Sequence, residues 1–512
     1  MTGPTSRALL ALVLFGLAGC DQSPTGPEPP TGELITSFQV NVNPSRAAPL
    51  AAEVVMTTSR VVSARVTVAG QGGPALEAAF DDLEGAVRLP VLGLYPGRAT
   101  TVRIDLVGPD GAILETRETE VTGQVLSSDF PEIDLEVASG PAPGVTLVSY
   151  FGHNSAVTPQ RAFAFDAAGD IRWALDFQGH PDLGGLFFDN GVERLENGNL
   201  YFGDRNSNRI YEVTMLGRVA QSWAIPGFRF HHQVKETARG TFVLTVDLEG
   251  AATIEDHVIE IDRATGEIVT VWDLRRLLDQ NRRAWPTDIA DLEVDWFHGN
   301  GLDAYSDGSV VVSGRTQGIV KVTPQQEVAW ILAPHRGWQT AGDGTDLSAK
   351  LLQPLDAAGQ PITDPAVLDG TATHPDFEWA WYQHAPKVLS DGTLLVFDNG
   401  DNRGYGGQGT YSRAVQYRID ENAMTIQQVW TYGRERGAET YSRIVSDVDA
   451  LEDANHVLFS PGAARGPSGP LGRIVEVDRA SKSVVWEAVV RAPQVPFGIT
   501  FHRAERLSLY PD

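Results

Sequence analysis

Tryptophans at regular intervals constrain the fold of this chain more than any other feature. Each ends a short hairpin of alternating polar and apolar residues, and the set is Trp173, Trp223, Trp272, Trp330, Trp430 and Trp486. The first four are separated by 50, 49 and 58 residues. A second hairpin with a tight turn, such as the one around Gly198, precedes each of these segments wherever the repeat is complete. Units of two hairpins at this period are typical of propeller blades, so the repeat predicts six blades.

The interval between Trp330 and Trp430 is 100 residues, about twice the others. Residues 337–376 are rich in Gly, Asp, Pro and Thr and contain no second hairpin that ends in Trp. We interpret this stretch as an insertion, because a loop of such length inside a domain indicates a functional segment. The alternating segment from Gly498 to Leu509 is expected to supply a strand that closes the ring.

The residues before the repeats predict a separate small domain. Residues 34–138 contain short alternating strands, and the segment from Leu94 to Ile104 resembles a strand corner of fibronectin-type domains. About 100 residues of this pattern suit a small β-sandwich, for which a spacer or docking role is the simplest interpretation. The predicted fold class is therefore all-β, with this sandwich followed by a six-bladed β-propeller over residues 144–512.

The first 33 residues have the pattern of an export signal and a spacer. Arg7 precedes an apolar run that ends in Leu-Ala-Gly and then Cys20, the one cysteine of the chain. This pattern resembles a bacterial lipoprotein signal over residues 1–19, with Cys20 as the lipidated residue. An ordinary secretory signal or a short buried helix is the alternative. Residues 20–33 form a Pro-rich spacer, so we expect an exported protein, anchored by lipid to the bacterial cell envelope and facing the periplasm or the outer surface.

Composition excludes several classes of protein. The chain has 66 acidic and 40 basic residues and a formal charge of -26, which argues against a nucleic-acid partner because phosphate binding needs basic surface. An apolar content of 42% excludes a disordered chain and one with many membrane spans. A single cysteine leaves no internal disulfide.

The blade register predicts which polar residues face the central channel. The first hairpin of each blade has a tight turn, and the innermost strand is expected to begin eight residues before it. These starting positions are Asn190, His232, Asn300, His384 and Ser446. The returning strands end near Asp204-Arg205, Asp247, Gly314-Arg315 and Asp398-Asn399. The start of a strand and the end of its hairpin partner lie on the same side of a sheet, so both sets are expected at one mouth. Polar residues at equivalent positions in successive blades are poor core fillers.

Three histidines are predicted near this mouth: His232, His298 and His384, with Arg315 beside them. Such imidazoles can bind a metal, transfer protons or attack as nucleophiles, while each one alone is as easily explained as a structural residue. His231 is expected to point away, because side chains alternate along a strand.

These segments together resemble the bacterial aryl-sulfate sulfotransferase family. The resemblance covers residues from about 144 to the C-terminus. It depends on the ordered set His231-His232, Asp295-Trp-Phe-His-Gly-Asn300, Ser313-Gly-Arg315, Ile319-Val-Lys-Val322 with Val328-Ala-Trp-Ile-Leu332, and Trp381-Tyr-Gln-His384 with Leu395-Val-Phe-Asp-Asn-Gly400. The family has a six-bladed propeller and a small N-terminal β domain. It moves a sulfuryl group between phenols by a ping-pong route without a nucleotide donor, and this implies neither a cofactor nor a metal.

The resemblance also implies roles for individual residues. His384 matches the sulfated nucleophile, His232 and His298 match its supporting histidines, and Arg315 matches the residue that faces the sulfuryl oxygens. Candidate contacts with the aryl sulfate or phenol are Asn300, Trp381 and Tyr382, although Trp381 and Tyr382 also suit packing in the blade. Gly299 stands where a larger residue is expected, which could shift His298.

Two other classes remain open from the residues alone. One is a tethered propeller that binds a sulfated or other anionic ligand without turnover. The other is a metal- or quinone-dependent propeller enzyme, which is less favoured because Arg315 would repel a cation and no vicinal cysteine pair exists. The pattern does not predict an oligomeric state.

Overall fold

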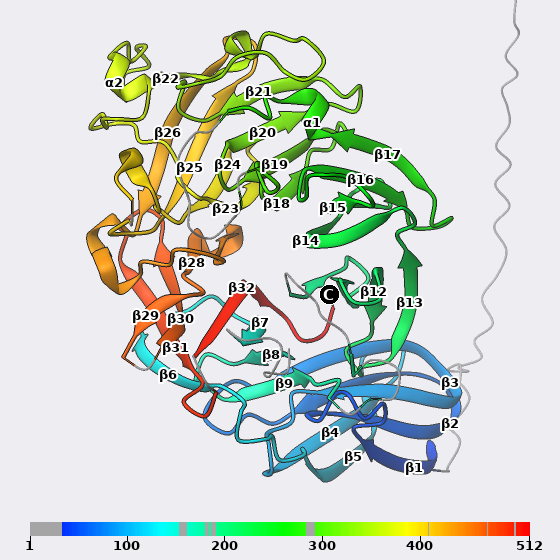
Figure 1. Cartoon of the computed structure of the whole chain (residues 1–512). Helices are drawn as coiled ribbons and strands as arrows, with labels where there is room; N and C mark the ends of the chain where they lie inside the picture. The colour runs from blue at the N-terminus through cyan, green and yellow to red at the C-terminus, as the bar shows by residue number, and fades with distance from the viewer. Residues whose placement is uncertain are drawn as a thin grey trace, which may run out of the picture.

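The computed structural model describes residues 33–511 except 153–160, 179, 181–183, 186–190, 283–290, 292, 408, 468 and 496–497. These residues form an almost entirely β structure in which a ring of sheets is joined to a small N-terminal domain (Figure 1). No helix in this described part is long and apolar enough to cross a membrane. The predicted signal, Cys20 and most of the spacer lie outside the described residues.

The N-terminal domain has five strands that belong to one hydrogen-bonded sheet. They are β1 (Ile35–Val42), β2 (Ala51–Val68), β3 (Leu76–Leu92), β4 (Ala99–Val107) and β5 (Ile113–Thr122). The first half of β2 pairs with β1 and the second half with β4, and its register with β3 shifts between Thr58 and Val62. One apolar core includes buried residues of β1 to β4. The small β domain is thus confirmed, and β2 is the long strand that pairs with β1, β3 and β4.

The propeller consists of six sheets among the described residues, and in each the innermost strand faces the centre of the ring (Figure 1). Blade 1 contains β32 (Ile499–Leu507), β7 (Val145–Gly152), β8 (Arg161–Phe165) and β9 (Ile171–Leu175). Blade 2 contains β10 (Glu193–Arg194), β11 (Leu200–Asp204), β12 (Arg209–Val213) and β13 (Val219–Ala224). Blade 3 contains β14 (Phe228–Glu236), β15 (Thr241–Leu248), β16 (His257–Asp262) and β17 (Ile268–Asp273).

The remaining three blades follow the same order from the channel outward. Blade 4 contains β18 (Gly299–Ala304), β19 (Val310–Gly314), β20 (Gly318–Val322) and β21 (Val328–Leu332). Blade 5 contains β23 (His384–Val388), β24 (Leu394–Asp398), β25 (Arg413–Asp420) and β26 (Thr425–Tyr432). Blade 6 contains β27 (Asp447–Leu451), β28 (His456–Ser460), β30 (Gly469–Asp478) and β31 (Val484–Arg491), with the short β29 (Ala464–Gly466) paired to β30.

The six repeated tryptophans lie on the outermost strands of these four-stranded units and join neighbouring blades. Each indole N–H donates a hydrogen bond of 2.8 to 3.1 Å to the turn before the outer strand of the next blade. Five acceptors are backbone carbonyls, at Met215, Arg263, Thr323, Arg479 and Ala167, and the acceptor for Trp330 is the Glu421 carboxylate. The repeat is therefore a structural device, since a buried indole needs a partner for its N–H.

The ring is closed by its two chain ends. The C-terminal strand β32 pairs with β7, so it provides the inner strand of the blade that β7 to β9 begin. In the neighbouring blade 6, β6 (Glu132–Ala138) pairs with β31 as an additional outer strand. The sequence prediction that residues up to 138 belong to the N-terminal domain is wrong for β6. The propeller begins at Glu132, because this strand takes its backbone partners from the last blade.

The predicted insertion adds no blade and lies at the outer edge of blade 5 (Figure 1). It contains η1 (Leu347–Lys350), β22 (Gln353–Leu355) and α2 (Pro365–Leu368), and β22 pairs in parallel with β26. The other short helices are α1 (Leu274–Leu277), η2 (Arg403–Tyr405), η3 (Arg434–Glu439) and η4 (Glu452–Ala454).

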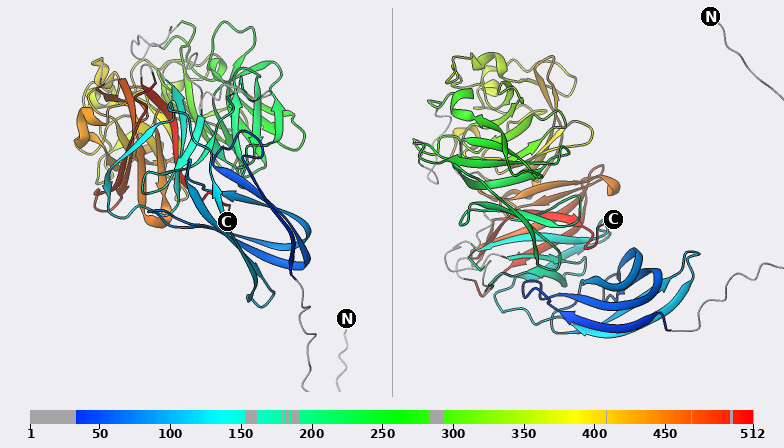
Figure 2. Two further views of the ribbon diagram at one scale, coloured as in Figure 1. Left: turned by 90° about the horizontal axis from the view of Figure 1, so that it is seen from below. Right: turned by 90° about the vertical axis from the view of Figure 1, so that its right-hand side faces the viewer.

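The N-terminal domain is fixed to the side of the propeller near β8, β9 and β13 (Figures 1 and 2). Arg172 of β9 donates to the carbonyl of Gly93 and stacks on the ring of Tyr95. The Tyr510 hydroxyl, beyond β32, accepts from the backbone N–H of Leu92. Because these contacts are buried and hydrogen-bonded, the two domains pack as one body at this interface.

Candidate active site

The inner strands bring the predicted site residues together at one mouth of the channel. His232 lies on β14, His298 directly precedes β18, Arg315 directly follows β19, and His384 begins β23. All four are buried. The Nε2 atoms of His232 and His298 are 3.4 Å apart, and Arg315 is close enough to change the ionisation of both His232 and His384. The four side chains therefore surround one small region.

Left-handed backbone conformations recur at this mouth. Outside glycine, positive φ angles of 53°, 54°, 55° and 91° occur at His232, His298, Tyr382 and Ser446, in four successive blades. Such angles are uncommon for residues with a Cβ atom and gather at functional sites. The ladder between β14 and β15 also shifts register between Phe230 and Val234.

This bulge corrects the prediction for His231. Its ring centroid lies 4.0 Å from that of His232 and 6.2 Å from that of His298, so it belongs to the same cluster. Strict alternation would have placed it on the opposite face, but the left-handed conformation at His232 interrupts alternation at this point. His231 is a site residue that the pattern missed.

Hydrogen bonds define which nitrogen of His384 carries the proton. The amide Nδ2 of Asn399 donates to the carbonyls of Ser442 and Val445, so its Oδ1 faces His384 Nδ1 at 2.7 Å. Nδ1 must therefore donate. On the other side, Asn300 Nδ2 lies 3.1 Å from His384 Nε2, as a donor to a lone pair. These contacts assign the tautomer in which Nε2 is unprotonated.

The surroundings of His384 and His232 favour neutral imidazoles. Burial lowers the pKa of His384 well below its ordinary value, and the charge of Arg315 lowers it further, against an opposing effect of the Asn399 hydrogen bond. Burial likewise lowers the pKa of His232 well below its ordinary value, with His231 and His298 adding to the effect. A neutral imidazole with an unprotonated nitrogen can act as a nucleophile or a base at neutral pH.

Arg315 is the fixed cation of this mouth. Burial lowers the pKa of its guanidinium, while Glu255 and Asp295 act to raise it, and an arginine stays protonated at neutral pH. Its Nε–H has no acceptor within the described part of the chain. A buried donor without a partner is costly unless a ligand satisfies it, and an anionic oxygen is the partner that suits a guanidinium.

Two buried carboxylates stand behind the histidines. His298 Nδ1 donates to Asp295 Oδ2 at 2.5 Å and lies 2.9 Å from Glu255 Oε2. The other Glu255 oxygen, Oε1, lies 2.6 Å from His231 Nε2. Burial by itself raises the pKa of Glu255, but His231 and His298 hold it well below its ordinary range.

These side chains include the donor types that bind Zn²⁺. Potential ligand atoms of Glu255, Asp295 and His298 lie within 4.8 Å of one another, as do those of His231, His232 and Glu255. However, the nitrogen–oxygen separations of 2.5 to 2.9 Å are hydrogen-bond lengths. Two ligands at about 2.1 Å from one Zn²⁺ ion stand more than about 3 Å apart. The separations are those of direct contacts between histidine and carboxylate side chains.

A further histidine borders the site from the closing strand. The ring centroid of His502 on β32 is 5.7 Å from that of His232, and His502 also affects the ionisation of His384. The sequence repeat gave no signal for it, because the inner strand of blade 1 comes from the opposite end of the chain and has no local hairpin.

Of the three predicted substrate contacts, Asn300 lies beside His384, whereas Trp381 and Tyr382 lie in an apolar core. Trp381 is buried in the core between blades 4 and 5 and packs edge-on against Tyr405, so blade packing describes it. Tyr382 is in the same core, but its carbonyl lies 3.2 Å from His384 Nδ1 and its phenol interacts electrostatically with Arg315. Asn190 lies outside the described residues.

Paired charges occupy the other end of the channel. A cavity of about 320 Å³ is lined there by residues from the inner strands of all six blades, including Glu193, Lys235, Asp303, Lys387, Asp449 and Glu505. Lys235 is 2.9 Å from Glu193, and Lys387 is 3.1 Å from Asp449. Burial raises the pKa of Glu505 to about 7, and the charge of Asp449 acts in the same direction.

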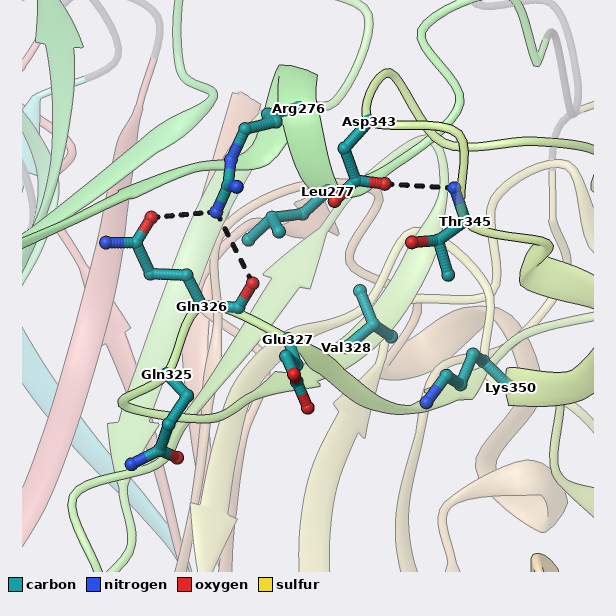
Figure 3. A pocket seen from close by; sticks show the side chains of 9 residues that line it. All are labelled: Arg276, Leu277, Gln325, Gln326, Glu327, Val328, Asp343, Thr345 and Lys350. Atoms are coloured by element: carbon teal, nitrogen blue, oxygen red, sulfur yellow. Dashed lines mark hydrogen bonds between the residues drawn. The ribbon is translucent and has the colours of Figure 1, made fainter.

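A cavity of about 410 Å³ lies apart from the histidines (Figure 3). It is formed by the end of α1, the turn before β21 and the insertion, and Arg276, Gln326 and Lys350 are among its lining residues. Arg276 donates to the side chain of Gln326 across it. It contains no member of the histidine cluster.

A propeller enzyme that handles an anionic group is the class that this fold and mouth define. Residues 135–495 match the family model described as arylsulfotransferase (ASST), and residues 39–123 match the arylsulfotransferase Ig-like domain. The chain therefore belongs to the arylsulfotransferase family and is a sulfotransferase.

Two curated relatives are described as arylsulfate sulfotransferases. Arylsulfate sulfotransferase AssT of Escherichia coli O6:H1 is 29% identical, over 90% of this chain and 90% of that protein. Arylsulfate sulfotransferase AssT of Lelliottia amnigena is 28% identical, over 93% of each. Among solved structures, a protein of unknown function from Bacteroides caccae matches with a TM-score of 0.39 and 13% identity, over 68% of this chain and 93% of that one.

Proposed function

We propose that this protein moves a sulfuryl group from an aryl sulfate to a phenolic acceptor through a covalently sulfated His384, without a nucleotide donor. The observation that carries the proposal is His384 itself, whose Nε2 is unprotonated in a fixed tautomer. Arg315 stands beside it with a buried donor to offer. Both relatives named above are arylsulfate sulfotransferases, which supports the substrate class.

The geometry suggests a route for both half-reactions. Nε2 of His384 attacks sulfur, the N–S bond forms, the bond from sulfur to the aryl oxygen breaks, and Arg315 faces the sulfuryl oxygens. The departing phenolate takes a proton from the pair His232 and His298. In the second half-reaction the acceptor phenol returns a proton to that pair, its oxygen attacks sulfur, and the N–S bond breaks to restore His384.

Turnover of 4-nitrophenyl sulfate tests this proposal directly. Without acceptor, we expect a burst of about one nitrophenol per active site and then little further release, because the sulfated enzyme has no partner. With added phenol, we expect sustained release, and double-reciprocal plots at several phenol concentrations should be parallel. Tight sulfate binding with no nitrophenol release would support a non-catalytic tethered propeller that binds an anionic ligand.

We also propose that the protein is exported and held at the cell envelope by lipid on Cys20, on the strength of the signal pattern alone. Cys20→Ser should move the protein from the detergent phase to the aqueous phase in detergent partitioning, because a lipid chain supplies the membrane affinity. Its phenol-dependent sulfotransferase activity should be retained. Gln22→Ala is the control and should partition as the unaltered protein does, and a Cys20→Ser variant that stays in the detergent phase contradicts the proposal.

A further inference from the structure

Glu255 is a buried carboxylate that the route above does not use. It lies before β16, with 7% of its surface exposed, and its two oxygens contact two different imidazoles. Oε1 is 2.6 Å from His231 Nε2, and Oε2 is 2.9 Å from His298 Nδ1. A carboxylate that bridges two buried rings limits the rotation of both.

The backbone holds Glu255 in this place from both sides. Its N–H donates to Asp247 Oδ1 at 2.7 Å, and its carbonyl accepts from the N–H of Gly299 at 2.9 Å. Its φ angle of 58° is in the left-handed region, which is uncommon for a residue with a Cβ atom. Three features thus fix the backbone from which the Glu255 side chain projects, as expected for a conformation that is kept for function.

Gly299 is what allows this approach. A Cβ atom at position 299 would lie 2.9 Å from the Glu255 carbonyl oxygen, too close without a backbone shift. Gly299 also follows His298 directly, so a larger residue would move the histidine and the carboxylate relative to each other. Gly299, where the resemblance leads one to expect a larger residue, therefore leaves room for the backbone contact with Glu255.

The charges at this mouth indicate what Glu255 does. The site is expected to admit a sulfate ester, which is an anion, yet Glu255 and Asp295 are two buried carboxylates next to it. Buried carboxylates are costly unless cations or protons compensate them. Arg315 supplies one positive charge, and the two imidazoles that contact Glu255 hold the pKa of this carboxyl well below its ordinary range against the effect of burial.

We propose that Glu255 is a positioning residue that orients His298 and His231 and keeps on His298 the proton that the leaving phenolate takes up. This inference depends on the proposed sulfuryl transfer, in which the bond to the aryl oxygen breaks while that oxygen gains the proton. Glu255 touches neither sulfur nor phenol, and it acts through His298.

Leaving-group dependence tests the role of Glu255. Glu255→Gln keeps the shape of the side chain but removes its charge. With phenyl sulfate, whose phenolate needs a proton, we expect the burst rate to fall by on the order of 10²-fold, the usual size of general acid catalysis. With 4-nitrophenyl sulfate, whose phenolate leaves without help, we expect a loss of less than about 10-fold. Gly299→Ala should show the same dependence, because it displaces the carboxylate without changing any charge.

Glu260→Gln is the matched control. Glu260 is a buried glutamate on β16 that pairs with Arg239 at 2.7 Å and does not contact the histidines, so its replacement should leave the leaving-group dependence unchanged. Equal losses for both donors in Glu255→Gln would reveal a merely structural residue and overturn the inference, while labelling of His384 would still report on sulfuryl transfer. Activity that chelators remove and Zn²⁺ restores would also overturn it, because Glu255 would then bind a metal.

Discussion

His384→Asn is expected to abolish both half-reactions. The nucleophile of the proposed route is the unprotonated Nε2 of His384, which Asn300 contacts at 3.1 Å. Asparagine is similar in shape to part of the imidazole, but its amide nitrogen has no available lone pair and cannot form the N–S bond. Neither the burst of phenol from the donor nor the transfer to an acceptor should remain above background.

Mass spectrometry of enzyme quenched with donor alone gives the direct measurement. The unaltered protein should carry about 80 Da, the mass of one sulfuryl group, on the peptide that contains His384, and the label should be lost in acid. His384→Asn should carry none. His374→Asn, in the insertion, is the control and should be labelled normally, because His374 is partly exposed and lies outside the histidine cluster.

Other labelling patterns would contradict this assignment in different ways. A label on His232 or His298 would keep the reaction class and exchange the roles of the histidines. Turnover without a label on any residue would favour direct transfer between two bound phenols.

Much of the fold could be predicted because each blade is built from local hairpins. The tryptophan spacing reports that local unit, and the same indoles turned out to donate across to the next blade. The prediction failed for β6 because its pairing is not local. Its partner β31 is about 350 residues away in the chain, and an outer strand leaves no mark in the sequence that says which sheet it joins.

The site could be predicted only as far as the strand register is regular. Register places His384 and Asn300 at one mouth, and the structure has them in contact. It fails for His231 because the left-handed residue His232 interrupts the alternation. Glu255 lies in the segment between β15 and β16, and the register of strands does not apply to it. His502 reaches the site because the C-terminal strand β32 pairs with β7, a pairing that local register does not report.

Arg315→Gln is expected to slow both half-reactions by about 10² to 10³, the usual cost of removing one oxyanion contact. The guanidinium stabilises charge on the sulfuryl oxygens without bonding to sulfur, so some activity should remain, unlike in His384→Asn. Arg275→Gln is the control, because Arg275 is already paired with Asp273 at 2.9 Å at the start of α1, and its loss should leave both half-reactions unchanged.

The same variant should change the pH dependence in a defined direction. In the unaltered protein, burial and then Arg315 hold the pKa of His384 well below its ordinary value, so Nε2 stays unprotonated through neutral pH. Removing the positive charge makes the imidazolium less costly, which raises the pKa of His384. The acid limb of the burst rate, measured between about pH 4 and pH 8 with donor alone, should therefore move to higher pH. A limb that stays in place, or moves to lower pH, would show that Arg315 does not act on His384 and would leave the nucleophile without its proposed electrostatic partner.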